Sequence, residues 1–407
     1  MLEFRLAGRL AQRQSVRFTS ERPQVQILHR PPLPLLENLM SKISYDKVGD
    51  NYGTKDPIKR LAQNSALKTA VNLKKSGYRE ISDTRGESAF VLSLGKNLPF
   101  IASVTESLGT KNLIADEMRN VSGKTYYDIV AHDTVASIIN DLITVGARPL
   151  SIHAFWAVET NDWLYDKKRM RDLVSGWKKA VDMSGAAWGG GETPTLKGII
   201  HPNTVDLAGS AVGIVDSEKR LITSKKLTVG DRILLLKSNG INANGISLAR
   251  AVAKRIPKGY ATKLNNGKFY GEELLTKTNI YAKVVQELLD ANINIHYISN
   301  ITGHGLRKIM RAKQNFSYIV ENIFDPEEIF LFIQKQAKLS DKEIYQVLNM
   351  GSDYAIFLPA GQVAEAKKII EENNFEALDA GYVEKGKRRV VIKPKNIEFF
   401  GSSLRLS

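Results

Sequence analysis

From Ile43 onward, the chain alternates short apolar runs with longer segments in which apolar residues recur every three or four positions. The first pattern is typical of buried strands and the second of amphipathic helices. This alternation predicts an α/β or α+β protein. We expect strands over residues 99–104, 205–215 and 232–236, and helices over residues 132–146, 162–183, 245–253, 272–291 and 306–311.

Two domains are expected in a chain of 407 residues, because a single hydrophobic core stops growing at about 250–300 residues. The charged segment Ser217 to Gly230, with a Val-Gly-Asp turn ahead of the strand that begins at Arg232, predicts the linker between them. We therefore expect an N-terminal extension over residues 1–39, a first domain over residues 40–225 and a second domain over residues 226–407.

The extension is rich in arginine, holds four of the thirteen prolines and shows no sustained periodicity. Three interpretations fit: a disordered segment, an organellar transit peptide, or the translation of a transfer-RNA gene in the wrong frame. We favour the third, because Gly8 to Pro32 resembles such a translation. Met40 would then be the true start.

Composition excludes several classes of function. The chain has no cysteine, which rules out disulfides, Cys-ligated zinc, iron–sulfur clusters and thiol catalysis. No run approaches the roughly 18 apolar residues of a membrane span, so we expect a soluble, cytoplasmic protein without membrane contact. The net charge of +15 is scattered among acidic neighbours, and the densest cluster, Lys385 to Arg389, is typical of a turn at a strand edge. We expect no nucleic-acid partner.

A glycine run followed by a carboxylate, Gly189-Gly190-Gly191-Glu192-Thr193, is the first segment that indicates phosphate chemistry. Glycines let backbone N–H groups approach an anion, and a neighbouring carboxylate can hold Mg²⁺. A plain tight turn uses the same residues, so both interpretations stay open for this run alone.

The helix expected from His132 is the second such segment. At about 100° per residue, its polar face carries Asp133, Ser137, Asn140 and Asp141, which are short oxygen-bearing side chains without a cation among them. This face suits metal-bound phosphates. The alternative is that Asp133 only caps the start of the helix.

Two further segments follow expected strands. Thr105 to Lys111 offers a carboxylate, Glu106, as a potential metal ligand and a lysine as a point charge for phosphate. Ser238 to Gly245 leads into a helix, whose N-terminal N–H groups and dipole make an anion site. Residues 301–305 also lead into a helix. Ordinary loop and turn chemistry is the alternative for each segment.

Taken together, these segments resemble the motifs of the phosphoribosylformylglycinamidine cyclo-ligase family over residues 45–392. The family's Thr-Asp-Gly-Val-Gly-Thr-Lys is similar to residues 105–111, its Asn-Asp helix to residues 140–141, and its Gly-Gly-Glu-Thr to residues 190–193. In the second half, its Ser-x-Gly-x-x-x-Asn-Gly loop is similar to residues 238–245, and its Leu-Leu-x-x-Thr-x-Ile-Tyr to residues 274–281.

The resemblance implies a homodimer in which the N-terminal sheets form a barrel, followed by a C-terminal α/β domain. It implies that ATP and a small phosphorylated substrate, formylglycinamidine ribonucleotide, bind between the domains. In the family's reaction ATP phosphorylates the formyl oxygen, and a nitrogen then displaces phosphate to close an imidazole ring. ADP, phosphate and aminoimidazole ribonucleotide are the products.

The resemblance also implies roles for individual residues. The implied Mg²⁺ ligands are Glu106, Asp133, Asp141, Glu192 and Asp206. The implied nucleotide-binding residues are Thr110, Lys111, Asn140, Gly190, Gly191, Thr193, Asn244 and Gly245. The implied catalytic residues are Lys111, Asp141 and His201, the last for proton transfer, with a plain surface-loop histidine as its alternative.

The chain departs from the family pattern at several expected ligand loops. Glu106 and Ser107 stand where the family has Asp-Gly, Asn242 replaces a histidine, and His304 interrupts Thr-Gly-Gly-Gly. A glycine-rich segment of the family is reduced to Arg85 to Ser88, and a late Asn-x-Gly-x-Gly becomes Asn349 to Asp353. Two alternatives therefore stay open: a phosphotransferase similar to thiamine-monophosphate kinase, and a non-catalytic nucleotide-binding protein.

Overall fold

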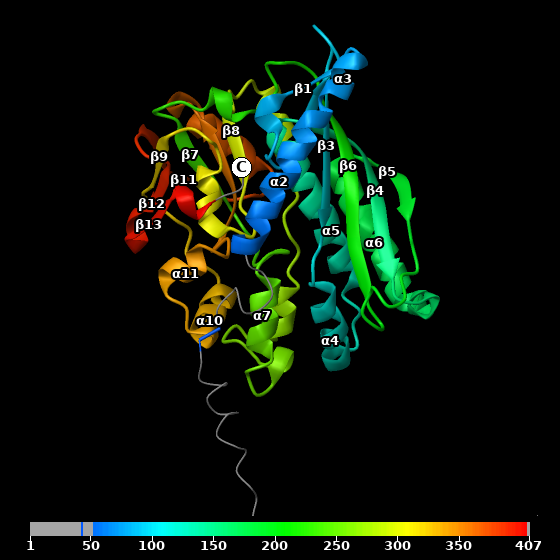
Figure 1. Cartoon of the computed structure of the whole chain (residues 1–407). Coiled ribbons are helices and arrows are strands. Elements are labelled where there is room, and N and C mark those ends of the chain that lie inside the picture. The colour runs from blue at the N-terminus through cyan, green and yellow to red at the C-terminus, as the bar shows by residue number, and fades with distance from the viewer. Residues whose placement is uncertain (1–41, 44–51, 405–407) are drawn as a thin grey trace, which may run out of the picture. The chain divides into compact units, whose positions relative to one another are not determined.

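A computed structural model describes residues 42–43 and 52–404, which contain two β-sheets and the helices that pack on them (Figure 1). The expected mixture of helices and strands is confirmed. The interpretations of residues 1–39, and of Met40 as the true start, lie outside the described residues.

The first sheet has six strands in the order β1-β2-β3-β6-β4-β5, antiparallel except for the pair β4 and β5. Its strands are β1 Arg79–Glu80, β2 Phe90–Ser93, β3 Phe100–Ser107, β4 Arg148–Val158, β5 Ala187–Glu192 and β6 Val205–Val215. The helices of this half are α2 Tyr52–Thr69, α3 Val71–Lys75, α4 Asn112–Ser122, α5 Tyr127–Leu142 and α6 Lys167–Ser184.

Helices α5 and α6 cover one face of this sheet. Alternate residues of β6 are buried, and Gly209 on the covered face lies against Ile138 of α5 and Trp177 of α6. The outward residues of β6 are only half-buried, and Phe155 of β4 is exposed on that side. One face of the sheet thus belongs to the core, and the other has no covering element within the described residues.

The second sheet has seven strands in the order β13-β12-β9-β11-β7-β10-β8, antiparallel except for β9 with β12. Its strands are β7 Arg232–Lys237, β8 Tyr297–Asn300, β9 Phe316–Val320, β10 Ser352–Leu358, β11 Ala377–Lys385, β12 Arg389–Ile392 and β13 Ile397–Phe400. Its helices are α7 Ile246–Ala253, α8 Tyr270–Leu274, α9 Ala282–Asp290, α10 Glu328–Ala337, α11 Asp341–Tyr345 and α12 Val363–Glu372.

Most expected elements are present with shifted ends. The strand 205–215 is matched in full, and helix α5 begins five residues before the expected start at residue 132. The stretch 306–311 forms a 3₁₀ helix, Gly305–Met310 (η7), instead of an α-helix. The chain passes from the first sheet to the second through residues 216–231, but the domain boundaries at residues 39 and 225 stay predictions.

The prediction of one continuous helix over residues 272–291 is wrong. Helices α8 and α9 are separated by residues 275–281, which are not helical. The backbone groups of Thr276, Thr278 and Tyr281 instead form hydrogen bonds with side chains of the first half. These bonds stabilise the non-helical conformation of this segment relative to a continuous helix.

The glycine run forms an edge strand rather than a tight turn. Residues 189–191 belong to β5, which pairs in parallel with β4. A Cβ atom on Gly191 would lie 2.2 Å from the carbonyl oxygen of Ala154, so the close pairing of the two strands requires glycine there. None of the described helices is long and apolar enough to cross a membrane.

The packing of α6 on α5 gives a direct test of this fold. A Cβ atom on Gly176 would lie 2.3 Å from the carbonyl oxygen of Asp128. Gly176→Ala should therefore push the helices apart and lower the free energy of unfolding by about 1–3 kcal/mol, measured by urea denaturation. The control Gly361→Ala, which adds a methyl group to open space, should change it little. Equal effects of the two substitutions would contradict this packing.

Candidate functional site

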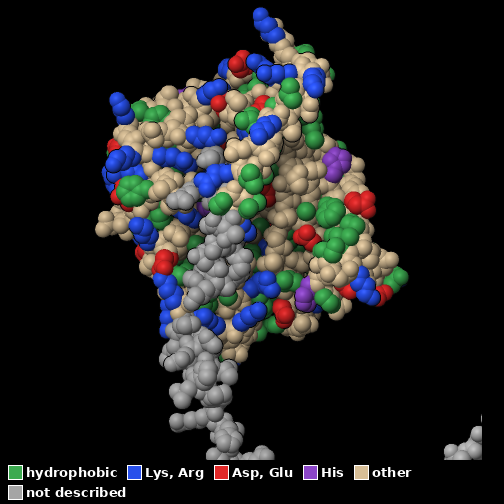
Figure 2. All heavy atoms as spheres, in the orientation of Figure 1, with side chains coloured by type: hydrophobic (Ala, Val, Ile, Leu, Met, Phe, Trp, Pro, Cys, Tyr) green, Lys and Arg blue, Asp and Glu red, His purple; other side chains and the backbone are tan. Residues whose placement is uncertain are grey.

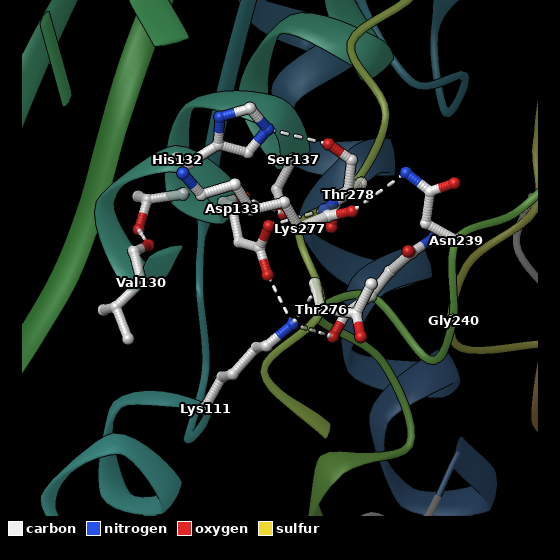
Figure 3. Close-up of polar contacts among 12 residues, drawn as sticks. Lys111, Val130, His132, Asp133, Ser137, Asn239, Gly240, Thr276, Lys277 and Thr278 are labelled. Carbon is white, nitrogen blue, oxygen red and sulfur yellow. Dashed lines mark hydrogen bonds and ion pairs between the residues drawn. The ribbon is translucent and has the colours of Figure 1, made fainter. Parts of the chain in front are cut away.

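The polar face of α5 joins the two halves of the chain (Figure 3). The Lys111 amine is fully buried, forms an ion pair with Asp133, and donates hydrogen bonds to the carbonyl oxygens of Asn242 and Thr276, both at 3.0 Å. Asp133 Oδ1 also accepts from the Thr278 amide at 2.8 Å. These partners use all three donors of the lysine, so its amine faces the segment 276–278 and not a cavity.

Other polar side chains on this face of α5 also form hydrogen bonds with backbone groups of the second half. Asn140 donates to the carbonyl oxygen of Asn279 at 2.7 Å and accepts from the amide of Tyr281 at 3.1 Å. His132 Nε2 donates to the carbonyl oxygen of Thr278 at 2.8 Å. The short polar side chains of α5 therefore satisfy the backbone of a non-helical segment from the second half.

A cavity of about 460 Å³ opens next to this interface. Both halves of the chain contribute to its walls. It is lined by Lys55, Lys59, Glu87, Ser88, Glu106, Ser107, Ser137, Asp141, Ala243, Asn244, Asn300, Thr302, Gly303, His304, Lys308 and Arg311.

Two predicted metal ligands, Glu106 and Asp141, meet in this cavity. Glu106 extends from the end of β3, and Asp141 from the last turn of α5, where its Oδ1 accepts from Asn300 Nδ2 at 2.7 Å. Glu106 remains accessible to solvent, although protein surrounds it on most sides. This desolvation, and after it the charge of Asp141, raise the pKa of Glu106 to about 7. Two carboxylates that repel each other in this way form a favourable place for a cation.

Basic residues also line the cavity. The Arg311 guanidinium forms an ion pair with Glu87 at 3.0 Å and donates to Ser88 Oγ at 3.0 Å and to the carbonyl oxygen of Gly86 at 2.9 Å. The segment 86–88 of the first half is thus held by an arginine of the second half. Lys59, from α2, also lines this cavity.

Lys308 lies beside Arg311 and is only 6% exposed. Its carbonyl oxygen accepts a hydrogen bond from Ser299 Oγ at 2.6 Å, which fixes the backbone of η7. Burial, and after it the positive charge of Arg311, lower the pKa of the Lys308 amine to about 7.

Other predicted site residues lie elsewhere. Gly190, Gly191, Glu192 and Thr193 are exposed at the end of β5, on the edge of the first sheet. Asp206 points to the uncovered face of that sheet, where burial raises its pKa. Thr110 lies in the turn before α4, and Asn244 with Gly245 directly precedes α7, with Asn244 in the cavity.

His201 lies in a different cavity. It is exposed, its Nδ1 is 3.2 Å from the carbonyl oxygen of Pro202, and it lines a space of about 470 Å³ together with Asp116 and Arg250. No lining residue is shared with the first cavity. Its role in proton transfer stays a prediction without support from this arrangement.

The five predicted carboxylates do not form one cluster. Within the part of the chain that the structure describes, no three histidine, aspartate or glutamate side chains gather to hold a metal ion. Asp133 is fully buried with Lys111, and Glu192 and Asp206 lie on β5 and β6, outside the lining of the first cavity. Only Glu106 and Asp141 share a cavity.

Sequence reasoning missed the basic residues of this cavity. Lys59 lies about 250 positions before Lys308 and Arg311, and none of the three lies in a phosphate-binding pattern. The only local signal was the Thr-Gly-His-Gly turn ahead of residues 306–311, which pointed to the right segment but not to these side chains.

Comparison with known families covers both halves. Residues 86–215 match the AIR synthase related protein, N-terminal domain, and residues 228–393 match the AIR synthase related protein, C-terminal domain. The first match covers most of the first sheet and the second match covers most of the second sheet, so the chain has a two-domain architecture.

Similar structures show the same fold. One chain of the HypE–HypF complex is 15% identical, with a TM-score of 0.54 over 77% of this chain and 92% of that chain. Phosphoribosylformylglycinamidine synthase II from Thermotoga maritima is also 15% identical, with a TM-score of 0.51 over 79% of this chain and 46% of that chain.

Relatives found by sequence have a higher identity to this chain than these structures do. The phosphoribosylformylglycinamidine cyclo-ligase of Carboxydothermus hydrogenoformans is 34% identical over 73% of this chain and 84% of its own length. The enzyme of the same name from Thermococcus kodakarensis is 32% identical over 78% and 91%. This similarity over most of both chains, together with the two domain matches, shows that the chain belongs to the phosphoribosylformylglycinamidine cyclo-ligase family.

Proposed function

We propose that this chain catalyses the ring closure of its family: ATP-dependent conversion of formylglycinamidine ribonucleotide to aminoimidazole ribonucleotide, with release of ADP and phosphate, in purine biosynthesis. The observation that carries the proposal is the meeting of three family motifs in one cavity. Glu106, Asp141 and Asn244 come from a strand end, a helix end and a turn before a helix, and they line the same space.

The chemistry of this cavity suits phosphoryl transfer, which requires positioning and charge neutralisation more than covalent catalysis. Glu106 and Asp141 would hold Mg²⁺, which commonly binds one or two carboxylates and completes its shell with phosphate oxygens and water. When bound, this ion neutralises charge on the phosphates. Lys59 and the amides that precede α7 add positive potential, and Arg311 holds residues 86–88 against the cavity wall.

Lys111 takes a different role in this proposal. Its buried contacts with Asp133, Asn242 and Thr276 support a positioning residue that fixes the two halves around the cavity, instead of a ligand for nucleotide phosphates. For Glu192, Asp206 and His201 the roles implied by the family resemblance stay predictions, as does the cytoplasmic location.

The first prediction concerns the reaction and separates two aspartates of α5. With MgATP and formylglycinamidine ribonucleotide, the wild type should form ADP and aminoimidazole ribonucleotide in equal amounts. Asp141→Asn should lower turnover on the order of 100-fold or more with little change in stability, because its amide oxygen can still accept from Asn300.

Asp133→Asn is the matched comparison. It leaves the Lys111 charge buried without a counter-charge, and should reduce the free energy of unfolding by about 3–5 kcal/mol in urea denaturation. Absence of both products with the wild type would refute the proposed reaction, and full turnover by Asp141→Asn would refute the assigned site.

A second prediction follows from the raised pKa of Glu106. Because this pKa of about 7 lies above the ordinary value of 4.5, the folded protein binds this proton more tightly than the unfolded chain. The stabilising contribution is complete below pH 4.5 and is lost as the pH rises through about 7. In metal-free buffer, Glu106→Gln should therefore melt above the wild type at pH 8, and this difference should shrink toward pH 5.

The control is Glu365→Gln, at an exposed position. The difference in melting temperature between this variant and the wild type should not change with pH. A constant difference in melting temperature between wild type and Glu106→Gln across this pH range would contradict the placement of Glu106 beside Asp141.

We also propose that the chain forms a homodimer through the uncovered face of its first sheet. Leu150 and Phe155 of β4 are 43% and 37% exposed, and Val212 and Ile214 of β6 are half-buried on the outward side. Figure 2 shows exposed hydrophobic side chains on the side of the molecule that carries β4 and β5. Such a face is typical of an interface between subunits and would form the family's barrel.

Phe155→Asp should therefore convert a dimer into a monomer, as measured by size-exclusion chromatography with light scattering. Leu331→Asp replaces a residue that is 51% exposed on α10 and should leave the dimer intact. A monomeric wild type at micromolar concentration would contradict this proposal.

A phosphotransferase is the second candidate, because several of the departures from the family pattern lie in this cavity. Glu106, Ser107 and His304, with Glu87 and Ser88, line the space in which the substrate would bind. A phosphotransferase would leave the γ-phosphate on an organic acceptor, whereas the cyclo-ligase releases it as inorganic phosphate. Phosphorus NMR of the products decides between them.

A further inference from the structure

Lys308 differs from the other buried cations of the site. Lys111 and Arg311 both have carboxylate partners, Asp133 and Glu87. Among the residues that the structure describes, the Lys308 amine forms no hydrogen bond, and no carboxylate lies within the 4.0 Å of an ion pair. A side chain that is 6% exposed thus directs an amine without a partner at the lining of the cavity.

An unpaired ammonium in this position is unfavourable for the protein alone. Burial removes water from the charge, and the neighbouring Arg311 guanidinium repels it. A methionine, which has a similar length and no charge, would fill the same volume at lower cost. The stability of the fold therefore gives no reason for a lysine here.

The carboxylates of the cavity do not supply the missing partner. Glu106 and Asp141 line the same space and interact electrostatically with Lys308, yet both lie beyond ion-pair distance. A group that enters the cavity can therefore contact the amine from the open side.

We propose that the Lys308 amine directly binds a phosphoryl group of the ligand in this cavity and is a catalytic residue of the chain. The proposal rests on the proposed function for the identity of the ligands. The amine supplies a positive charge and N–H donors to phosphate oxygens, and no covalent bond or proton transfer is involved.

The charges around Lys308 favour an anion over a neutral ligand. Arg311 cannot turn toward the ligand without losing Glu87, Ser88 and Gly86, so its charge stays fixed near Lys308. Lys55 and Lys59 of α2 line the same cavity. An anion that reaches Lys308 thus meets several positive charges within one confined space.

Two sources can supply this phosphoryl group: the γ-phosphate of ATP, released as inorganic phosphate, and the phosphate ester of the ribonucleotide. Weaker binding of the ribonucleotide with an unchanged KM for ATP would identify the ester. A lower kcat with weaker binding of inorganic phosphate would identify the transferred group. Either result supports the proposal.

The experiment compares Lys308→Met, Lys308→Arg and the exposed control Lys283→Met, whose side chain is 72% exposed. Calorimetry with MgADP, inorganic phosphate and formylglycinamidine ribonucleotide should show at least one of these binding about 10–100-fold more weakly to Lys308→Met. Lys308→Arg should recover part of this loss. The melting temperature of Lys308→Met without ligand should equal or exceed that of the wild type.

A second measurement uses the wild type and does not depend on the folding of a variant. Acetylation with acetic anhydride, read by mass spectrometry, should modify Lys308 less when the same three ligands are present, and Lys283 equally with and without them. Protection of Lys308 by inorganic phosphate or MgADP in a protein without cyclo-ligase turnover would support the inference while refuting the proposed function.

Two results would overturn the inference. One is wild-type affinity and turnover in Lys308→Met, and the other is equal acetylation of Lys308 with and without every ligand. If the wild type closes the ring and either result is found, the proposed function stands and the role of Lys308 is wrong.

Discussion

The buried ion pair between Lys111 and Asp133 is the interaction on which the rest of the structure depends. It lies where α5 of the first half meets residues 276–281 of the second, and each partner also bonds to the backbone of that segment. A buried charge that loses its partner costs several kcal/mol, so the pair strongly favours one arrangement of the two halves. That arrangement brings Asp141, at the end of the same helix, beside Asn300 of the second sheet.

The cavity follows from this arrangement. Its carboxylates Glu106 and Asp141 come from the first half, whereas its basic residues come from both halves, Lys55 and Lys59 from α2 and Lys308 and Arg311 from η7 and the residue after it. Arg311 crosses between the halves to hold residues 86–88 of the first half. A side chain from one half thus takes over the positioning of a loop in the other. Carboxylates and cations thus line one space, as a phosphate and its metal ion require.

The family motifs serve two purposes in this chain. Some of their residues, such as Glu106, Asp141 and Asn244, line the cavity. Others, such as Lys111 and Asn140, have the same polar chemistry but satisfy buried backbone groups of the second half. Both groups are short oxygen-bearing or cationic side chains at strand and helix ends. Their residue types alone therefore do not distinguish ligand binding from the joining of domains.

The sequence by itself determined the elements whose patterns are local. The spacing of apolar residues identified the strand 205–215 and most of α5, and the charge cluster identified the turn near residue 386. The ordered motifs identified the family. Only the tertiary structure decided that residues 275–281 leave the helix, that the glycine run becomes an edge strand, and that Lys308 lines the same cavity as Glu106 and Asp141. The physical reason is that these outcomes depend on partners distant in the chain. Burial, charge pairing and backbone satisfaction between such partners appear only after the two halves have packed.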